Sequence, residues 1–168
     1  MVESAEGQRC WQFVVELYAK PGVSQACLAL QDRLGVDVSF LLTILFYAVR
    51  GGADFQADEI ARLDHTISGW RNEVIRPLRA LRRRLKGGDL LSQPTDEFYR
   101  RIKADELSAE QIEIGALVRQ LEQRPGNPST KTGRAVIERV ARHFAEASGQ
   151  AAHLNDDEIQ HAISILHS

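Results

Sequence analysis

Apolar positions are densest between Pro21 and Gly52, where their spacing predicts two helices joined by a short turn. In the second helix, apolar residues cover every side of the cylinder instead of one face. A helix of this kind is normally buried all round, and it is shorter than the roughly 20 apolar residues that cross a bilayer. We therefore expect a helical hairpin at the centre of the fold. The fully apolar helix contains Phe40, Leu41, Leu42, Ile44, Leu45, Phe46 and Val49.

The turn of this hairpin contains signals for both helix ends. Gly35, directly after Leu34, can take the positive φ that often ends a helix. Asp37 can cap the next helix by accepting hydrogen bonds from its first backbone amides. Val36 and Leu41 have the spacing of a hydrophobic staple around this cap. The sequence therefore predicts where the first helix ends and the second begins.

Amphipathic helices are predicted on both sides of the hairpin. One runs from about Gln8 to Lys20, and the longest covers residues 60–86 and ends at Gly87-Gly88. Pro77 removes a backbone donor, so we expect a kink there or a division into two helices. The apolar stripe of the long helix consists of Ile60, Leu63, Ile67, Trp70, Val74, Leu78, Leu81 and Leu85.

The remainder of the chain also has helical patterns. The pattern of residues 89–124 predicts one or two helices, and a capping box predicts that a second helix starts at Ser108. After the turn cluster at residues 124–129, about 40 residues are few for an independent core. We therefore predict one all-α domain over residues 1–168, a bundle of about seven helices. Residues 8–124 form its main bundle, and residues 125–168 form a helical pair packed on it.

Composition and charge fit a globular protein without a specialised surface. Of the 168 residues, 43% are hydrophobic and 26% are charged, and the formal net charge of -2 argues against a surface built as a whole for nucleic acid or an anionic membrane. The start of the chain does not resemble a secretion signal, and no membrane span is predicted. Cys10 and Cys27 lack CxxC spacing and fit buried thiols of a reducing compartment better than a disulfide or a reactive thiol. We expect a cytoplasmic protein.

The long helix carries a concentration of positive charge. Residues 62–86 include eight basic and two acidic side chains, so this segment has a charge of +6 and the rest of the chain −8. Arg76, Arg79, Arg83 and Lys86 fall on one stripe, and guanidinium groups can bind carboxylates or phosphates with paired hydrogen bonds. This arginine stripe has three possible interpretations. It is a solvated or internally paired face, a site for a protein partner with an acidic surface, or a site for RNA.

Catalytic and metal-binding motifs are sparse. Glu158 and His161 form a single ExxH, whereas a di-metal helical bundle needs two such motifs and further carboxylates. Asp64 and His65 are adjacent, so they point to different sides of a helix. We expect surface positions for the isolated histidines, and we predict no catalytic residue, cofactor or metal. The isolated histidines are His143, His153 and His167.

Several polar side chains lie beside the apolar helices near the hairpin. Buried polar groups need partners, so we predict that Asp32 or Asp37 pairs with an arginine of the long helix, Arg71 or Arg76. The alternative is that both aspartates are solvated at helix ends. A third interpretation places a polar core or small-molecule pocket here. Its residues would be Trp11, Tyr18, Gln31, Asp32 and Asp37.

The same region resembles an uncharacterised family of short proteobacterial proteins, a conserved domain of unknown function. The resemblance is specific over about residues 10–50 and extends more weakly to about Gly87. Ser39 departs from the expected Asn. The resemblance implies a small helical bacterial protein and supplies no catalytic residues. The matching positions are Trp11, Phe13, Leu17, Tyr18, Pro21-Gly22-Val23, Ala26-Cys27-Leu28, Leu30-Gln31-Asp32, Gly35, Asp37-Val38 and Leu41-Leu42.

Three functions remain open at this point. The first is a non-enzymatic interaction or adaptor protein that uses the arginine stripe. The second is an accessory protein of RNA or the ribosome, whose binding would fall steeply with salt. The third is a small-molecule binder or enzyme with a pocket at the N-terminal helices, which the right ligand would stabilise against unfolding.

Overall fold

The computed structural model describes residues 4–86, 94–122 and 133–167, and nearly all of them lie in helices. No strand occurs in this part of the chain, which confirms the prediction of an all-α, single-domain helical bundle. The elements are α1 (Ala5–Tyr18), α2 (Val23–Leu34), α3 (Val38–Gly51), α4 (Ala57–Trp70), the π-helix η1 (Arg71–Ile75), α5 (Arg76–Lys86), α6 (Asp96–Leu121), α7 (Gly133–Ala147), the 3₁₀-helix η2 (Ala151–Asn155) and α8 (Asp157–His167).

The helix ends of the hairpin follow the local signals. Gly35 ends α2 with φ of 71°, in the left-handed region that glycine adopts without strain. The Asp37 side chain accepts a hydrogen bond of 3.1 Å from the backbone N–H of Phe40 and so caps α3. Both predictions for this turn are confirmed. The start of α1 lies earlier than expected because Ser4 caps it through the backbone N–H of Gly7.

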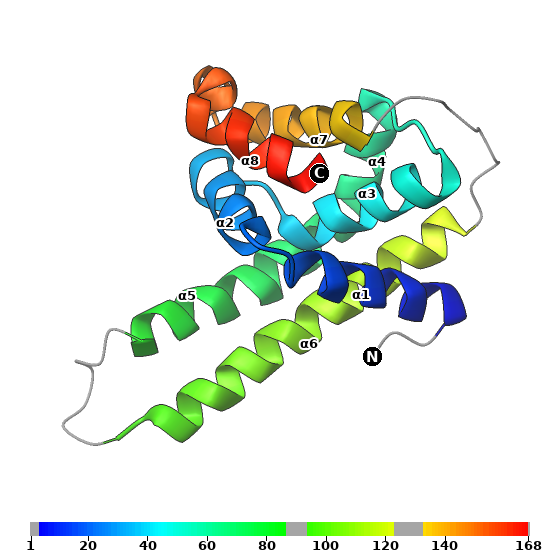
Figure 1. Cartoon of the computed structure of the whole chain (residues 1–168). Helices are drawn as coiled ribbons and strands as arrows, with labels where there is room; N and C mark the ends of the chain where they lie inside the picture. The colour runs from blue at the N-terminus through cyan, green and yellow to red at the C-terminus, as the bar shows by residue number, and fades with distance from the viewer. Residues whose placement is uncertain (1–3, 87–93, 123–132, 168) are drawn as a thin grey trace.

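The apolar helix α3 occupies the centre of the molecule (Figure 1). It packs against α1 and α6 on one side and against α7 on the other. Residues 39–46 of α3 are all buried, as the apolar pattern predicted. Val49 is the exception among the predicted positions, because its side chain is 59% exposed near the end of the helix.

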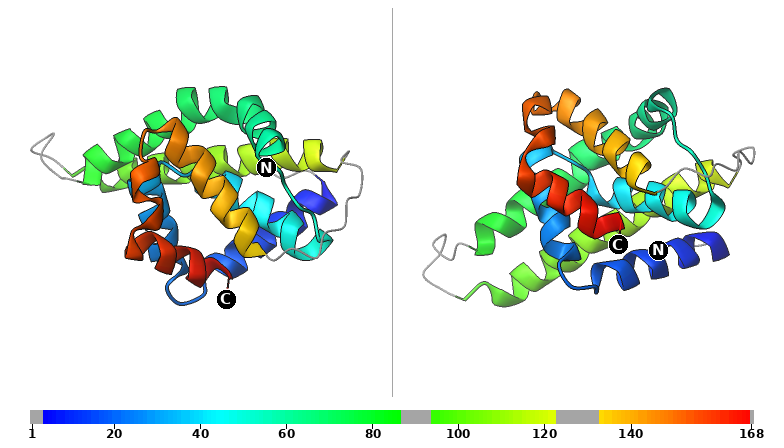
Figure 2. Two further views of the ribbon diagram at one scale, coloured as in Figure 1. Left: turned by 90° about the horizontal axis from the view of Figure 1, so that it is seen from above. Right: turned by 45° about the horizontal axis from the view of Figure 1, so that its top comes forward.

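The C-terminal helices α7 and α8 complete the hydrophobic core. Val140 and Phe144 of α7 and Ile159 and Ile163 of α8 belong to the same buried cluster as the apolar residues of α2 and α3. In Figure 2, α8 lies next to α2, and the two helices pack against each other. The turn cluster at residues 124–129, which the sequence suggested as a break, falls outside the described residues.

The long helix is divided, as Pro77 suggested, but the division is a π-helical turn that comes before the proline. In η1, the backbone N–H of Arg76 donates to the carbonyl of Arg71, five residues earlier. The wider turn shifts the helical register, so Ile75 is buried instead of the predicted Val74. Trp70, which we placed on the buried stripe, is 38% exposed and donates from Nε1 to the Ala109 carbonyl at 3.0 Å.

Beyond η1, the chain leaves the core. We call α5 together with residues 96–106 of α6 the arm, since these segments extend away from the other helices in both figures (Figures 1 and 2). No residue of α5 is buried, and Leu81 of the predicted apolar stripe is 39% exposed. The second half of the predicted long helix therefore packs mainly on α6 instead of on the core.

The prediction of a helix start at Ser108 is wrong, because α6 runs unbroken from Asp96 to Leu121. The Ser108 hydroxyl donates to the Ala104 carbonyl inside the helix instead of capping a new one. No proline interrupts this stretch, and Glu106 and Glu110 hold the helix to α5 on both sides of the expected break. Within the described residues, no helix is both long enough and apolar enough to cross a membrane.

Candidate functional site

A groove of about 830 Å³ lies between α1, α2 and the α5–α6 pair, and side chains of α3 also contribute to its lining. Ligand sites commonly have such a size and combine apolar walls with a few polar groups. The apolar and aromatic lining residues are Trp11, Val14, Val15, Tyr18, Ala19, Cys27, Leu28, Val38, Leu42, Ala104, Leu107 and Ile114. The polar lining residues are Gln31, Ser39, Arg79, Arg82, Arg100, Lys103, Glu106 and Glu110.

The groove contains only part of the polar set that the sequence singled out. Trp11, Tyr18 and Gln31 line it, whereas Asp32 and Asp37 do not. Asp32 is exposed, and Asp37 is buried at the start of α3. The structure therefore separates the predicted residues into a groove and two different ion pairs.

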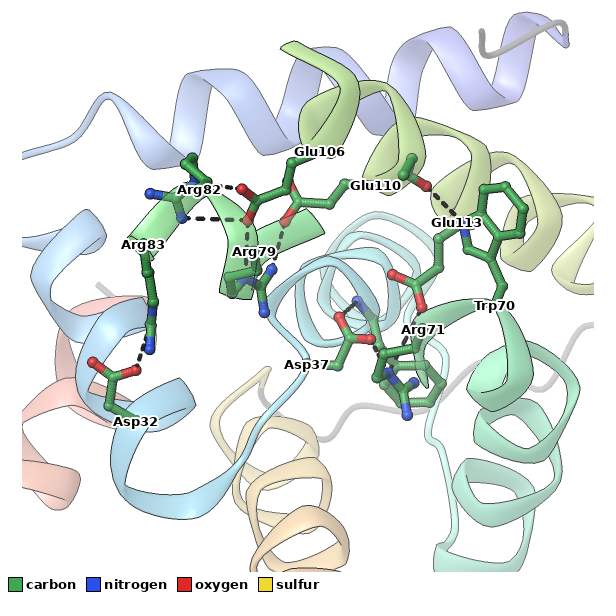
Figure 3. Close-up of polar contacts among 12 residues, drawn as sticks. Asp32, Asp37, Trp70, Arg71, Arg79, Arg82, Arg83, Glu106, Glu110 and Glu113 are labelled. Carbon is green, nitrogen blue, oxygen red and sulfur yellow. Dashed lines mark hydrogen bonds and ion pairs between the residues drawn. The ribbon is translucent and has the colours of Figure 1, made fainter. Parts of the chain in front are cut away.

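One wall of the groove carries an arginine–glutamate cluster, formed by Arg79, Arg82, Glu106 and Glu110. Arg79 donates to Glu106 at 2.9 Å and to Glu110 at 2.7 Å, and Arg82 donates to the second oxygen of Glu106 (Figure 3). These contacts join α5 to α6, so we call them the arm cluster. They confirm internal pairing for Arg79, one of the four residues of the predicted arginine stripe.

The two glutamates of the arm cluster differ in their acid strength. Burial acts to raise the pKa of Glu106, but hydrogen bonds and charge from Arg82 and Arg79 outweigh it, so its pKa is lowered. Burial also raises the pKa of Glu110, and Arg79 offsets this only in part. Glu106 is therefore the more firmly ionised carboxylate on this wall.

The remaining residues of the predicted stripe do not gather at one site. Arg83 pairs with Asp32 at 2.9 Å, with side chains 52% and 54% exposed (Figure 3). Arg76 and Lys86 are exposed and make no ion pair with a described residue. Internal pairing thus accounts for two members of the stripe, and the other two face solvent.

A second charge cluster is buried at the junction of five elements. Arg71 of η1 donates to the Asp37 carboxylate and pairs with Asp64 of α4 at 2.6 Å. Its Nε lies 3.8 Å from the Glu113 carboxylate of α6, and its guanidinium lies 5.0 Å from the Phe144 ring of α7. We call this set the core cluster; Figure 3 labels its members Asp37, Arg71 and Glu113. It confirms the predicted pairing of Asp37 with Arg71.

Glu113 is the least expected member of the core cluster. Its side chain is fully buried, and neither carboxylate oxygen accepts a hydrogen bond from a described residue. Burial raises the pKa of Glu113 to about 10, and the charge of the nearby Asp37 carboxylate adds to this effect. Glu113 is therefore a neutral carboxylic acid at pH 7, which reduces the negative charge that Arg71 must balance.

His143 also contacts this cluster. Its Nε2 lies 2.8 Å from the Asp64 carboxylate, and its ring packs edge-on against Phe144. The side chain is only 22% exposed, so the expectation of an isolated surface histidine is wrong for this residue. His153 is partly buried and lies 2.9 Å from Asp156, whereas His167 is exposed as predicted.

The sequence analysis missed Asp64, Glu113 and His143 as members of the core cluster. Glu106, Glu110 and Glu113 recur at spacings of four and three residues, so the sequence did carry a signal that they share one face of α6. The partners of these acids could not be read in the same way, because they come from α4, η1, α5 and α7.

The two cysteines behave as small hydrophobic residues. Both are free and buried, and burial raises the pKa of each thiol to about 12. Cys27 lines the groove but is a thiol instead of a thiolate at neutral pH, so it is a weak nucleophile. Among the described residues, no group of His, Cys, Asp and Glu has an arrangement that could hold a metal ion. Glu158 of the ExxH pairs instead with Arg33 at 3.2 Å.

These features define an all-α bundle with a largely apolar groove on one side and a charge-bearing arm beside it. Residues 9–117 match the family described as protein of unknown function DUF2390, and the chain belongs to this family. The match ends within α6, so α7 and α8, which complete the core, lie beyond it. No curated protein and no solved structure matches the chain.

Proposed function

We propose that this protein binds a small, largely apolar molecule in the groove between α1, α2 and the arm. The observation that carries the proposal is the groove itself, which has the volume of a ligand site and walls from several helices. Trp11 and Tyr18 offer aromatic surface, and Leu28 and Leu107 offer exposed apolar surface. A ligand that covers these side chains would gain the free energy of removing them from water.

Exposed apolar side chains support this proposal. Nine large hydrophobic residues are exposed in the described part of the chain, and four of them line the groove. A cluster of exposed apolar residues often marks a binding site, whereas single ones are common on any protein surface. The four are Val15, Tyr18, Leu28 and Leu107.

Gln31 adds a polar group that can orient a ligand. It is partly buried in the lining, and its side-chain amide makes no hydrogen bond with a described residue. An amide offers both donors and an acceptor, so a ligand with a carbonyl or hydroxyl group could pair with it. Gln31 is a positioning group in this proposal.

The test is a ligand screen with matched variants. The wild-type protein is screened against small apolar and amphipathic compounds by thermal shift, and hits are measured by calorimetry. Leu28→Glu places a charge on the groove wall, while Leu81→Glu changes a similarly exposed leucine outside the groove lining. We expect Leu28→Glu to weaken binding at least tenfold and Leu81→Glu to leave it unchanged. Equal loss in both variants, or no hit with the wild type, would contradict the proposal.

A second candidate function is the capture of a protein partner with an acidic surface by α5. It is favoured by Arg76, Arg84 and Lys86, which are exposed and have no ion pair with a described residue. Reversing Arg79 or Arg83 would break internal pairs, so the informative variant is Arg76→Glu with Arg84→Glu. Native pull-down with and without nuclease tests this function. A partner retained after nuclease and lost in the variant would support an adaptor, and one lost on nuclease treatment would support RNA association.

A further inference from the structure

We propose that the ligand of the groove is a single-chain amphiphile with an anionic head, a carboxylate or a phosphate. The head would lie at Arg100 and Lys103, and the apolar tail would extend along α6 toward Ile114. This inference rests on the proposed function of the groove and adds the chemical class of the ligand and its direction of binding.

The charge of the lining supports an anion. Four cations and two carboxylates line the groove, and both carboxylates are already bound by Arg79 and Arg82. Arg100 and Lys103 make no ion pair with a described residue, and the Arg100 Nε reaches only the Asp96 carbonyl at 3.4 Å. The groove therefore has two cations without a carboxylate partner among the described residues, both on the same helix.

The position of these cations indicates the direction in which the ligand lies in the groove. Arg100, Lys103, Leu107 and Ile114 follow one another at helical spacing along the groove side of α6. At 1.5 Å per residue, the distance from Arg100 to Ile114 along the helix axis is about 21 Å. Arg100 and Lys103 lie in the arm, whereas Ile114 is buried in the core.

The middle of the groove is unfavourable for a charged head. A second anion beside Glu106 and Glu110 would meet two carboxylates whose arginine partners are already occupied. At the inner end, Trp11, Leu42 and Ile114 offer no ionic partner, so an anion there would lose its hydration without compensation. The outer end with Arg100 and Lys103 is thus the favourable position for the head.

The same head-group chemistry occurs in free fatty acids and in membrane lipids. We commit to the free molecule, because the tail would lie among α1, α2, α3 and α6 and would have to leave the bilayer to reach this position. The experiment therefore includes a separate measurement with vesicles.

The experiment compares three ligands with the same chain: decanoate, decyl phosphate and decanol, each below its aggregation concentration at pH 7.5. Binding is measured by calorimetry and by tryptophan fluorescence, to which Trp11 in the groove contributes. The test variant is Arg100→Gln with Lys103→Gln, and the matched control is Arg84→Gln with Lys86→Gln. Both pairs are exposed cations, but only the first lines the groove.

We expect the wild type to bind the two anions at least tenfold more tightly than decanol, and the test variant to lose this preference while still binding decanol. The control variant should retain the preference, and circular dichroism should show that all variants are folded. Equal affinity for decanol and the anions would overturn the inference and leave the proposed function standing. Binding of none of the three ligands would overturn the inference, and the wider screen then decides the proposed function. Binding only to vesicles with 30% anionic lipid would overturn the assignment to a free molecule.

Discussion

The core cluster and the arm cluster use the same arginine–carboxylate chemistry at different depths. In the core cluster, the side chains of Arg71, Asp37 and Glu113 are 6%, 7% and 0% exposed. In the arm cluster, those of Arg79 and Arg82 are 20% and 23% exposed. Removing a charge from the core cluster leaves buried partners without a counter-charge. In the arm cluster, Arg79, Arg82 and Glu110 are reached by solvent, and Glu106, though only 7% exposed, is bound by two arginines. The depth of a pair therefore decides how much it matters to stability.

The largest effect is expected for Arg71→Met. This change leaves the buried Asp37 carboxylate and the partly buried Asp64 carboxylate without their arginine and removes the contact with the Phe144 ring. We expect a loss of about 3–5 kcal/mol in the free energy of unfolding, measured by urea denaturation at pH 7. A loss below about 1 kcal/mol would show that water reaches these carboxylates and that the cluster is not buried in solution.

Glu113→Gln tests the neutral state of the buried acid. In the unfolded chain Glu113 ionises near the ordinary glutamate pKa of 4.5, but in the folded chain burial raises its pKa to about 10. Between these two values, the folded state holds one more proton, so stability falls as the pH rises; outside this window, Glu113 contributes no slope. Relative to the variant, the wild type should lose up to about 1.4 kcal/mol per pH unit within the window.

The measurement for Glu113→Gln is urea denaturation of both proteins at pH 6, 7 and 8. Glutamine has nearly the same shape and is neutral, so the variant should fold and should have the weaker dependence on pH. Parallel pH profiles for the two proteins would contradict the assignment of a neutral carboxylic acid.

A smaller effect is expected for Arg79→Met in the arm cluster. The change removes hydrogen bonds to Glu106 and Glu110, but Glu106 keeps its bond from Arg82, and Glu110 is 23% exposed and can be rehydrated. We expect a loss of about 1–2 kcal/mol. Hydrogen exchange should become faster in α5 and remain unchanged in α3. Equal acceleration in both helices would mean that the arm and the core unfold together.

The smallest effect is expected for Arg83→Ala. Its pair with Asp32 joins α5 to α2, but both side chains are about half exposed. Such pairs contribute little, so the free energy of unfolding should change by no more than about 0.5 kcal/mol. The same denaturation series measures it, and a loss comparable to that of Arg79→Met would indicate that exposure does not separate the two pairs.

Much of the fold could be predicted from the sequence because its signals are local. The apolar pattern of α3 predicted a central buried helix, and Gly35 and Asp37 predicted the turn before it. The helix start predicted at Ser108 was wrong because its signal, too, was only local. A capping box is also compatible with a helix interior, and the contacts of Glu106 and Glu110 with α5 favour continuity there.

The candidate site was only partly predictable. Trp11, Tyr18 and Gln31 were grouped correctly because they lie on neighbouring helices of the N-terminal region, and all three line the groove. Nine of the 20 lining residues come from α5 and α6, whose position beside α1 depends on contacts between residues far apart in the chain. Nothing in the spacing of Arg100 and Lys103 indicated that they line the same groove as Trp11.

By itself, the sequence determined the all-α class, the central helix and the ends of the hairpin, because helix periodicity and caps act within one or two turns of the chain. The tertiary structure alone decided which arginines are occupied, which acid is neutral, and where the groove lies. Arg79 and Glu106 are 27 residues apart and Arg71 and Asp37 are 34 apart. The charge state of a side chain depends on such neighbours and on burial, and both arise only when the helices pack.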